Sequence, residues 1–159
     1  MIKYMNLIGI KARKASEYKV TTEVKNKVLN DYAKLIKNEK KFIINQNSKD
    51  INYARKKGLK ENLIKRLHLN ENKLNGIINS ILKIAKLRDP IDNTLDKWKR
   101  PNGLNIKRVS IPIGVIGVIY ESRPNVTSDV ASLCFKSGNV VILKGGSEAI
   151  NSNKALAML

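Results

Sequence analysis

The sequence predicts an α/β protein in which a helical N-terminal region precedes the start of a parallel sheet. Three observations support this fold class. Apolar residues recur at steps of three and four through residues 5–88, which is typical of helices. Two apolar runs, 115–120 and 140–143, lack the polar alternation of a half-exposed strand, and a helix-like segment follows each run. We expect a helical segment over 1–94, a β-hairpin over 95–110 and an incomplete α/β domain over 111–159.

The charge of the 159-residue chain is strongly basic and unevenly spread. The net charge is +18, of which residues 1–108 carry +17. A nucleic-acid partner is one interpretation. The lysines are dispersed and aromatic residues make up only 5% of the chain, so the favoured interpretation of the basic charge is a drift of the amino-acid composition toward Lys, Asn and Ile. The N-terminal residues contain no signal peptide or membrane segment, so we expect a cytoplasmic protein without a membrane partner.

The cysteine and histidine content argues against a disulfide-stabilised protein and against a metal-binding protein. One cysteine cannot form an internal disulfide, and a single histidine beside it gives no metal-ligand spacing. We therefore predict no metal site.

Two apolar stripes define the expected helical core. The cleaner stripe begins after Asn70, a suitable N-cap, and ends before Asp89-Pro90, while Lys56-Lys57-Gly58 is typical of the end of an earlier helix. The stripes are expected to be buried; they comprise Val24, Val28, Tyr32, Leu35 and Ile36 in the first, and Leu74, Ile77, Ile78, Ile81, Leu82 and Ala85 in the second.

Asn102-Gly103 predicts a tight hairpin, because both residue types tolerate positive φ. Trp98 is expected to pack this hairpin against the rest of the protein; a binding role is the alternative.

The segment from residue 111 onward predicts two strand–helix units. The run Val115–Tyr120 is expected to be a strand covered on both faces. Arg123-Pro124 ends it, and Thr127-Ser128-Asp129 offers caps for the next helix. Gly138 is expected to end that helix, and Ser147 to cap the last one.

Both strand ends predict one anionic site. In open parallel sheets, ligands bind beyond the carboxyl ends of the strands, here Glu121 to Asn125 and Lys144 to Ser147. Helix N-termini favour anions, Gly145 and Gly146 would allow close approach, and Lys144 adds a cation. A nucleotide or an anionic substrate is the resulting hypothesis, although Gly-Gly after a strand is also common in a simple turn.

Other polar residues of this segment leave alternatives open. Arg123 could clamp a carboxylate or phosphate, or form a salt bridge with Glu121. Asn125 could donate to an oxyanion or cap the following helix. Cys134 lies mid-helix without a nearby histidine, so an inert buried thiol is favoured over a nucleophile. Gly114 and Gly117 do not form a dinucleotide fingerprint.

The run from Pro112 to Asn153, PIGVIGVIYESRPNVTSDVASLCFKSGNVVILKGGSEAINSN, resembles the signature region of the glutamate-5-semialdehyde dehydrogenases, or gamma-glutamyl phosphate reductases. This family belongs to the aldehyde dehydrogenase superfamily. The resemblance covers essentially the whole chain and implies an aldehyde-dehydrogenase-like fold. Its upstream parts, in the family's order, are Lys11 to Ser16, Asn47 to Asp50, Lys57-Gly58-Leu59, Asp89-Pro90 and Trp98 through Leu104.

The resemblance implies a function in proline biosynthesis: NADPH-dependent reduction of L-glutamate 5-phosphate to the 5-semialdehyde, with release of phosphate. A cysteine thiolate of the family forms the thioester that hydride reduces. By position in the motifs, the implied cofactor-binding residues are Lys144, Gly145, Gly146, Ser147 and Glu148. The implied substrate-binding residues are Glu121, Arg123 and Asn125.

The chain departs from the family in length. The family's nucleophilic cysteine lies in a later segment, and Cys134 does not match it, so we expect this N-terminal fragment to be inactive alone. No kinase-like segment precedes it, which favours the stand-alone reductase. Complete family members are implied to be homo-oligomers, with the Asn102-Gly103 hairpin resembling part of a subunit-contact arm. The alternatives are an inactive remnant of the enzyme and a basic nucleic-acid-binding protein.

Overall fold

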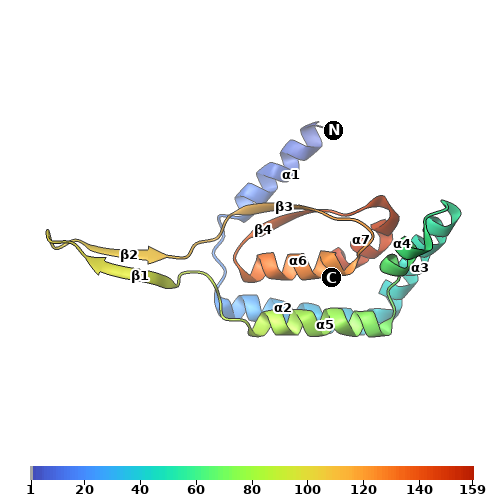
Figure 1. Ribbon diagram of the computed structural model, residues 1–159, viewed down its shortest axis with the longest axis horizontal. Helices are drawn as coiled ribbons and strands as arrows, with labels where there is room; N and C mark the ends of the chain where they lie inside the picture. Colours follow the sequence, from blue (N-terminus) through green and yellow to red (C-terminus); the bar gives the residue numbers. More distant parts are fainter. Residues whose placement is uncertain (1) are drawn as a thin grey trace.

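The computed structural model describes residues 2–159, in which one helix projects above a small parallel sheet and several others lie beneath it (Figure 1). Along residues 2–159, five helices are followed by a two-stranded hairpin and two strand–helix units, and the predicted α/β class is confirmed. The helices before the strands are α1 (Ile2–Ala15), α2 (Thr22–Asn38), α3 (Lys40–Lys56), α4 (Glu61–Leu67) and α5 (Glu71–Lys86). The later elements are β1 (Thr94–Lys99), β2 (Asn105–Val109), β3 (Val115–Ile119), α6 (Asn125–Lys136), β4 (Val140–Lys144), the 3₁₀ turn η1 (Ser147–Ala149) and α7 (Ile150–Met158).

Helix α5 forms the centre of the core, as its apolar stripe predicts. It packs between α2 and α6, and its stripe is buried apart from the partly exposed Leu82. The Asn70 side chain accepts a hydrogen bond from the backbone N–H of Lys73 at 2.9 Å, which confirms the predicted N-cap. Gly58 has a φ of +68° directly after α3, so the predicted end of that helix is also confirmed.

The buried face of α2 differs from the predicted one. Leu29, Ala33 and Ile36 contact the core, whereas Val24 and Val28 remain 47% and 45% exposed. Helix α2 carries apolar residues on two faces, and local spacing does not reveal which of them meets a partner. The position of α5 decides it, because α5 packs on the face that contains Leu29.

The antiparallel hairpin of β1 and β2 projects from the body of the molecule (Figure 1). Residues 100–104 connect its strands, and Gly103 has a φ of +86° while Asn102 does not have positive φ. The hairpin prediction is therefore confirmed, but the connection is longer than a two-residue turn. Trp98 keeps 40% of its surface exposed because the hairpin stands away from the core.

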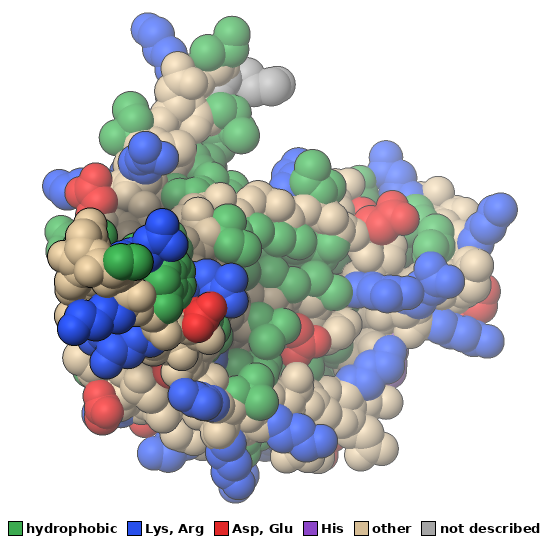
Figure 2. All heavy atoms as spheres, turned by 60° about the vertical axis from the view of Figure 1, so that its left-hand side comes forward, with side chains coloured by type: hydrophobic (Ala, Val, Ile, Leu, Met, Phe, Trp, Pro, Cys, Tyr) green, Lys and Arg blue, Asp and Glu red, His purple; other side chains and the backbone are tan. Residues whose placement is uncertain are grey.

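Strands β3 and β4 pair in parallel, with Val115 opposite Val140 and Ile119 opposite Lys144. The expectation that the first of these strands is covered on both faces is wrong for this chain. Helix α6 lies under one face, but Ile119 on the other is 86% exposed. Figure 2 shows hydrophobic side chains gathered on a face beside the protruding α1. Within residues 2–159, no helix is both long and apolar enough to cross a membrane.

Candidate functional site at the strand carboxyl ends

A cavity of about 440 Å³ opens where β3 and β4 end. The parallel register places Ile119 beside Lys144, so the loops that follow the two strands face each other. The cavity therefore joins four of the residues that the sequence predicted for one site, Glu121, Lys144, Gly145 and Gly146. Its lining consists of Ile119, Tyr120, Glu121, Lys144, Gly145 and Gly146.

Lys144 is the cation of this cavity. Its side chain is exposed, and its Nζ donates one long hydrogen bond of 3.3 Å, to the carbonyl oxygen of Gly145. Among residues 2–159 it forms no salt bridge. The ammonium group is therefore available to an anionic ligand.

Glu148 does not point freely into the cavity, because its carboxylate binds the loop after β3. Glu148 Oε1 accepts hydrogen bonds from the backbone N–H of Ser122 at 2.7 Å and from its hydroxyl at 3.0 Å. Partial burial raises the pKa of Glu148, but hydrogen bonds from its own backbone N–H and from Ser122, together with the charge of Lys144, outweigh burial and leave that pKa below its ordinary value. Glu148 is therefore held as an anion that links the two strand-end loops.

The prediction that Ser147 caps the last helix is wrong. Ser147 begins η1 and makes no capping hydrogen bond, and α7 begins only at Ile150. The cap comes from Asp50 of α3, whose carboxylate accepts from the backbone N–H groups of Asn151 at 3.1 Å and Ser152 at 2.7 Å. The same carboxylate also accepts from the side chains of Asn151, through Nδ2 at 2.7 Å, and of Ser152, through its hydroxyl at 2.6 Å. A carboxylate of the chain itself thus occupies the helix N-terminus that was expected to receive a ligand anion.

The long-range contacts that Asp50 and Asn47 make within the chain were not predicted, although the sequence holds a signal for them. Both fall on the buried face of α3 with Ile43, Ile51 and Ala54. Polar residues in an apolar stripe require buried hydrogen-bond partners. Asn47 finds them in the backbone of Leu67 and Leu69 and in Ser152.

The two glycines of the cavity are explained by packing within the chain. A Cβ added to Gly145 would lie 2.2 Å from Asn153 Nδ2 and 3.2 Å from the ring of Tyr120, and one added to Gly146 would lie 2.1 Å from Glu148 Oε1. All three contacts are closer than ordinary van der Waals distances. These internal contacts favour glycine whether or not a ligand approaches.

A chain of hydrogen bonds connects Tyr120, at the end of β3, to α6 and α7. Thr127 is buried, and its hydroxyl donates to Asn153 Oδ1 at 3.0 Å. The hydroxyl of Tyr120 lies 2.6 Å from the same Thr127 oxygen. Because Thr127 has a single hydroxyl proton, Tyr120 is the donor in that contact.

The remaining predicted substrate residues lie outside the cavity lining. Arg123 is exposed and forms no salt bridge with Glu121 or with any other residue of 2–159, so the local ion pair is absent. Helix α6 begins at Asn125, earlier than the expected caps, and Asn125 donates to Asp129 Oδ2 at 3.2 Å instead of capping. Thr127 and Ser128 are consequently buried within the first turns of α6.

Cys134 is buried on α6, and burial raises the pKa of its thiol. This environment matches the inert thiol that the sequence favoured, because a nucleophilic cysteine requires a lowered pKa. Residues 2–159 contain no cluster of acidic, histidine and cysteine side chains that could hold a metal ion.

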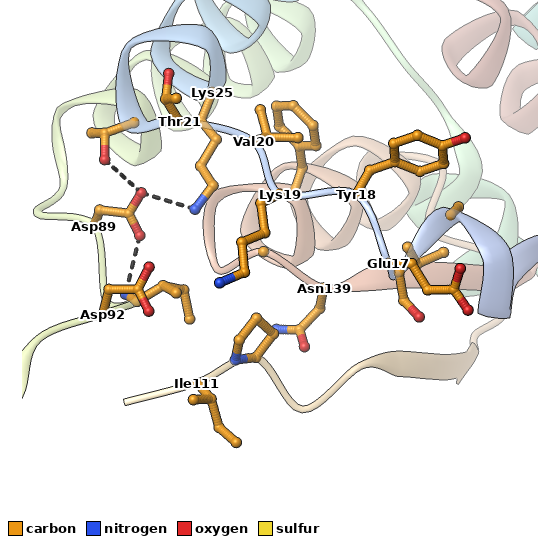
Figure 3. Close-up of a pocket in the computed structure, with 18 of the residues that line it drawn as sticks. Glu17, Tyr18, Lys19, Val20, Thr21, Lys25, Asp89, Asp92, Ile111 and Asn139 are labelled. Carbon is orange, nitrogen blue, oxygen red and sulfur yellow. Dashed lines mark hydrogen bonds and ion pairs between the residues drawn. The ribbon is translucent and has the colours of Figure 1, made fainter. Parts of the chain in front are cut away.

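A larger cavity, of about 780 Å³, lies near the amino end of β4 (Figure 3). Lys25 reaches from α2 to Asp89, and its Nζ lies 2.8 Å from Asp89 Oδ2. Asp89 also accepts from the Thr22 hydroxyl and the backbone N–H of Ile91. The charges of Lys25 and Asp89 are therefore satisfied by each other, while Glu17, Lys19, Glu23 and Asp92 line the cavity without a salt bridge in residues 2–159.

Fold and cavity together define part of a layered α/β protein with a cavity at the carboxyl ends of its parallel strands, where open parallel sheets generally bind their ligands. No protein-family model matches the chain. The gamma-glutamyl phosphate reductase of Halothermothrix orenii is 49% identical over 157 residues, which are 96% of this chain and 38% of that protein. The one from Clostridium tetani is 46% identical over 159 residues, covering 99% of this chain and 37% of that protein.

Solved structures agree. The crystal structure of gamma-glutamyl phosphate reductase from Thermotoga maritima matches with a TM-score of 0.90 at 43% identity, over 93% of this chain and 36% of that one. The Saccharomyces cerevisiae enzyme matches with a TM-score of 0.91 at 33% identity, over 96% of this chain and 39% of that one. The chain belongs to the gamma-glutamyl phosphate reductase family, and it spans less than two fifths of the length of the relatives it matches.

Proposed function

We propose that this chain provides the NADP(H)-binding part of a cytoplasmic gamma-glutamyl phosphate reductase of the aldehyde dehydrogenase superfamily. The reaction is the NADPH-dependent reduction of L-glutamate 5-phosphate to L-glutamate 5-semialdehyde, with release of phosphate, in proline biosynthesis. The observation that carries the proposal is the exposed Lys144 in a cavity at the strand carboxyl ends, in a chain that is 49% identical to a named reductase.

The residues at the cavity fit part of a phosphorylated nucleotide. Lys144 offers an unpaired ammonium group, which suits the ribose or the 2′-phosphate of NADPH. Gly145 and Gly146 form the adjoining wall, with Ser147 and Glu148 directly after them. The cofactor supplies hydride when bound. On the opposite wall, Glu121 precedes Arg123 and Asn125, which we assign to the substrate side.

We also propose that this chain does not complete the reaction by itself. The thioester step requires a thiolate, and Cys134, the single cysteine of the 159 residues, is buried with a raised pKa. A reductase assay of the chain with glutamate 5-phosphate and NADPH should therefore show no turnover, and sustained NADPH oxidation would contradict this part of the proposal.

Titration of the chain with NADPH, followed by cofactor fluorescence, tests the assigned site. Lys144→Ala should weaken NADPH binding about 10-fold, the loss of one charge-assisted contact. Lys154→Ala removes an exposed lysine from α7 and serves as the matched control, with unchanged affinity expected. Equal affinities of the wild type and Lys144→Ala would remove Lys144 from the site.

A further inference from the structure

The contact between Ser122 and Glu148 joins the two loops that form the cavity. Ser122 follows Glu121 of one wall, and Glu148 follows Gly146 of the other. Two donors of Ser122, its backbone N–H and its hydroxyl, bind the same carboxylate oxygen at 2.7 and 3.0 Å. Ser122 is 5% exposed, so this contact is shielded from competing water.

The backbone of Ser122 shows why the contact is needed. Ser122 has a φ of +47°, and the only other residue of 2–159 with positive φ that is not glycine is Asp92. This left-handed conformation is unfavourable for a side chain with a Cβ, and it persists where the surroundings impose it. Hydrogen bonds to a carboxylate are about twice as strong as neutral ones, and the two from Ser122 stabilise the turn.

Gly146 makes the contact possible. A Cβ at this position would lie 2.1 Å from Glu148 Oε1 and 2.4 Å from Oε2. With glycine there, the carboxylate folds back over its own loop and reaches across to Ser122. The spacing of Gly146 and Glu148 thus lets the Glu148 carboxylate reach Ser122, which local sequence patterns did not reveal.

We infer that Glu148 is a positioning residue of the nucleotide site: through Ser122 it holds the loop after β3 in place against the loop that carries Lys144. This inference rests on the proposed function, since it assigns a role to Glu148 in NADPH binding. Both donors of Ser122 bind the same oxygen of Glu148, Oε1, so the link between the loops depends on that one carboxylate oxygen.

A double-mutant cycle on NADPH affinity tests the inference. Ser122→Ala and Glu148→Ala should each weaken binding, by about 3-fold and about 10-fold, and the double variant should bind no more weakly than Glu148→Ala, because both changes break one contact. Glu148→Gln should bind within about 3-fold of the wild type, since its amide oxygen still accepts from both donors of Ser122. Unchanged affinity of Ser122→Ala, or additive losses in the double variant, would overturn the positioning role.

A measurement without ligand separates this inference from the proposed function. Hydrogen exchange, resolved by NMR, should show the Ser122 amide protected in the wild type and in Glu148→Gln, and at least about 10-fold less protected in Glu148→Ala. Equal protection in Glu148→Ala would show that no such link forms. If the wild type binds no NADPH, the proposed function fails whatever the exchange result; if Lys144→Ala alone weakens binding, only the positioning inference fails.

Discussion

The two ends of the parallel strand pair hold cavities that differ in how one lysine of each is paired. Near the amino end, about 780 Å³ surrounds Lys25 and Asp89, which neutralise each other. At the carboxyl end, about 440 Å³ lies beside Lys144, whose ammonium has no carboxylate partner in residues 2–159. The difference concerns these two lysines, because Glu17, Lys19, Glu23 and Asp92 also line the amino-end cavity without a salt bridge in residues 2–159. An unpaired charge alone therefore does not distinguish the two cavities; the position of Lys144 does, because open parallel sheets bind their ligands beyond the carboxyl ends of the strands.

The largest effect should come from breaking the amino-end pair. Asp89→Ala leaves the ammonium of Lys25, which is 4% exposed, without its partner, and should lower the free energy of unfolding by about 3 kcal/mol. Urea unfolding measures this loss. Asp31→Ala, which removes exposed ion pairs on α2, is the matched control and should leave the midpoint essentially unchanged. NADPH affinity should not change in Asp89→Ala; a parallel loss of affinity would mean that the two ends are coupled.

Acid should have the same effect on this pair without a mutation. Burial raises the pKa of Asp89, but the hydrogen bonds from Lys25, Ile91 and Thr22 and the charge of Lys25 outweigh it, so the folded pKa lies below the ordinary value. A lowered folded pKa stabilises the protein above the unfolded pKa of about 3.9, and this contribution disappears as the pH falls through the folded pKa. Asp89→Asn should therefore unfold with a weaker dependence on pH below about pH 4 than the wild type.

A smaller loss should follow from changing the cap of α7. Asp50→Asn keeps the shape of the side chain but replaces one of its two acceptor oxygens by a donor, which leaves donors of Asn151 or Ser152 unpaired. We expect about 2 kcal/mol less stability in thermal or urea unfolding. Asn45→Ala, at an exposed position of the same helix, should be neutral. A neutral Asp50→Asn would show that the cap contributes nothing to the fold at the carboxyl end.

The smallest effect on binding is expected at Cys134, which lines neither cavity. Its burial should slow alkylation by iodoacetamide at pH 8 at least about 10-fold relative to the urea-unfolded chain. Cys134→Ala should leave NADPH affinity unchanged. Rapid alkylation of the folded chain that NADPH slows would place this thiol at the site.

Local sequence patterns predicted the elements whose signals lie within a few residues. Asn70 caps α5 through Lys73, three residues later, and Gly138 ends α6 with a φ of +68°. The parallel pairing of β3 and β4 then made it predictable from topology that Glu121 and Lys144 line one cavity. These features depend on backbone preferences and on the alternation of strands and helices.

Tertiary structure alone decided the contacts between residues distant in the chain. Asp50 caps α7 about a hundred residues later, Glu148 binds Ser122 across the strand pair, and α5 selects the face of α2 that is buried. No local pattern contains these choices, because a buried carboxylate accepts from whichever donors the packing brings to it. The sequence therefore determined the order of elements and which strand ends lie together, and the packing determined that the carboxylates of Asp50 and Glu148 are bound within the chain.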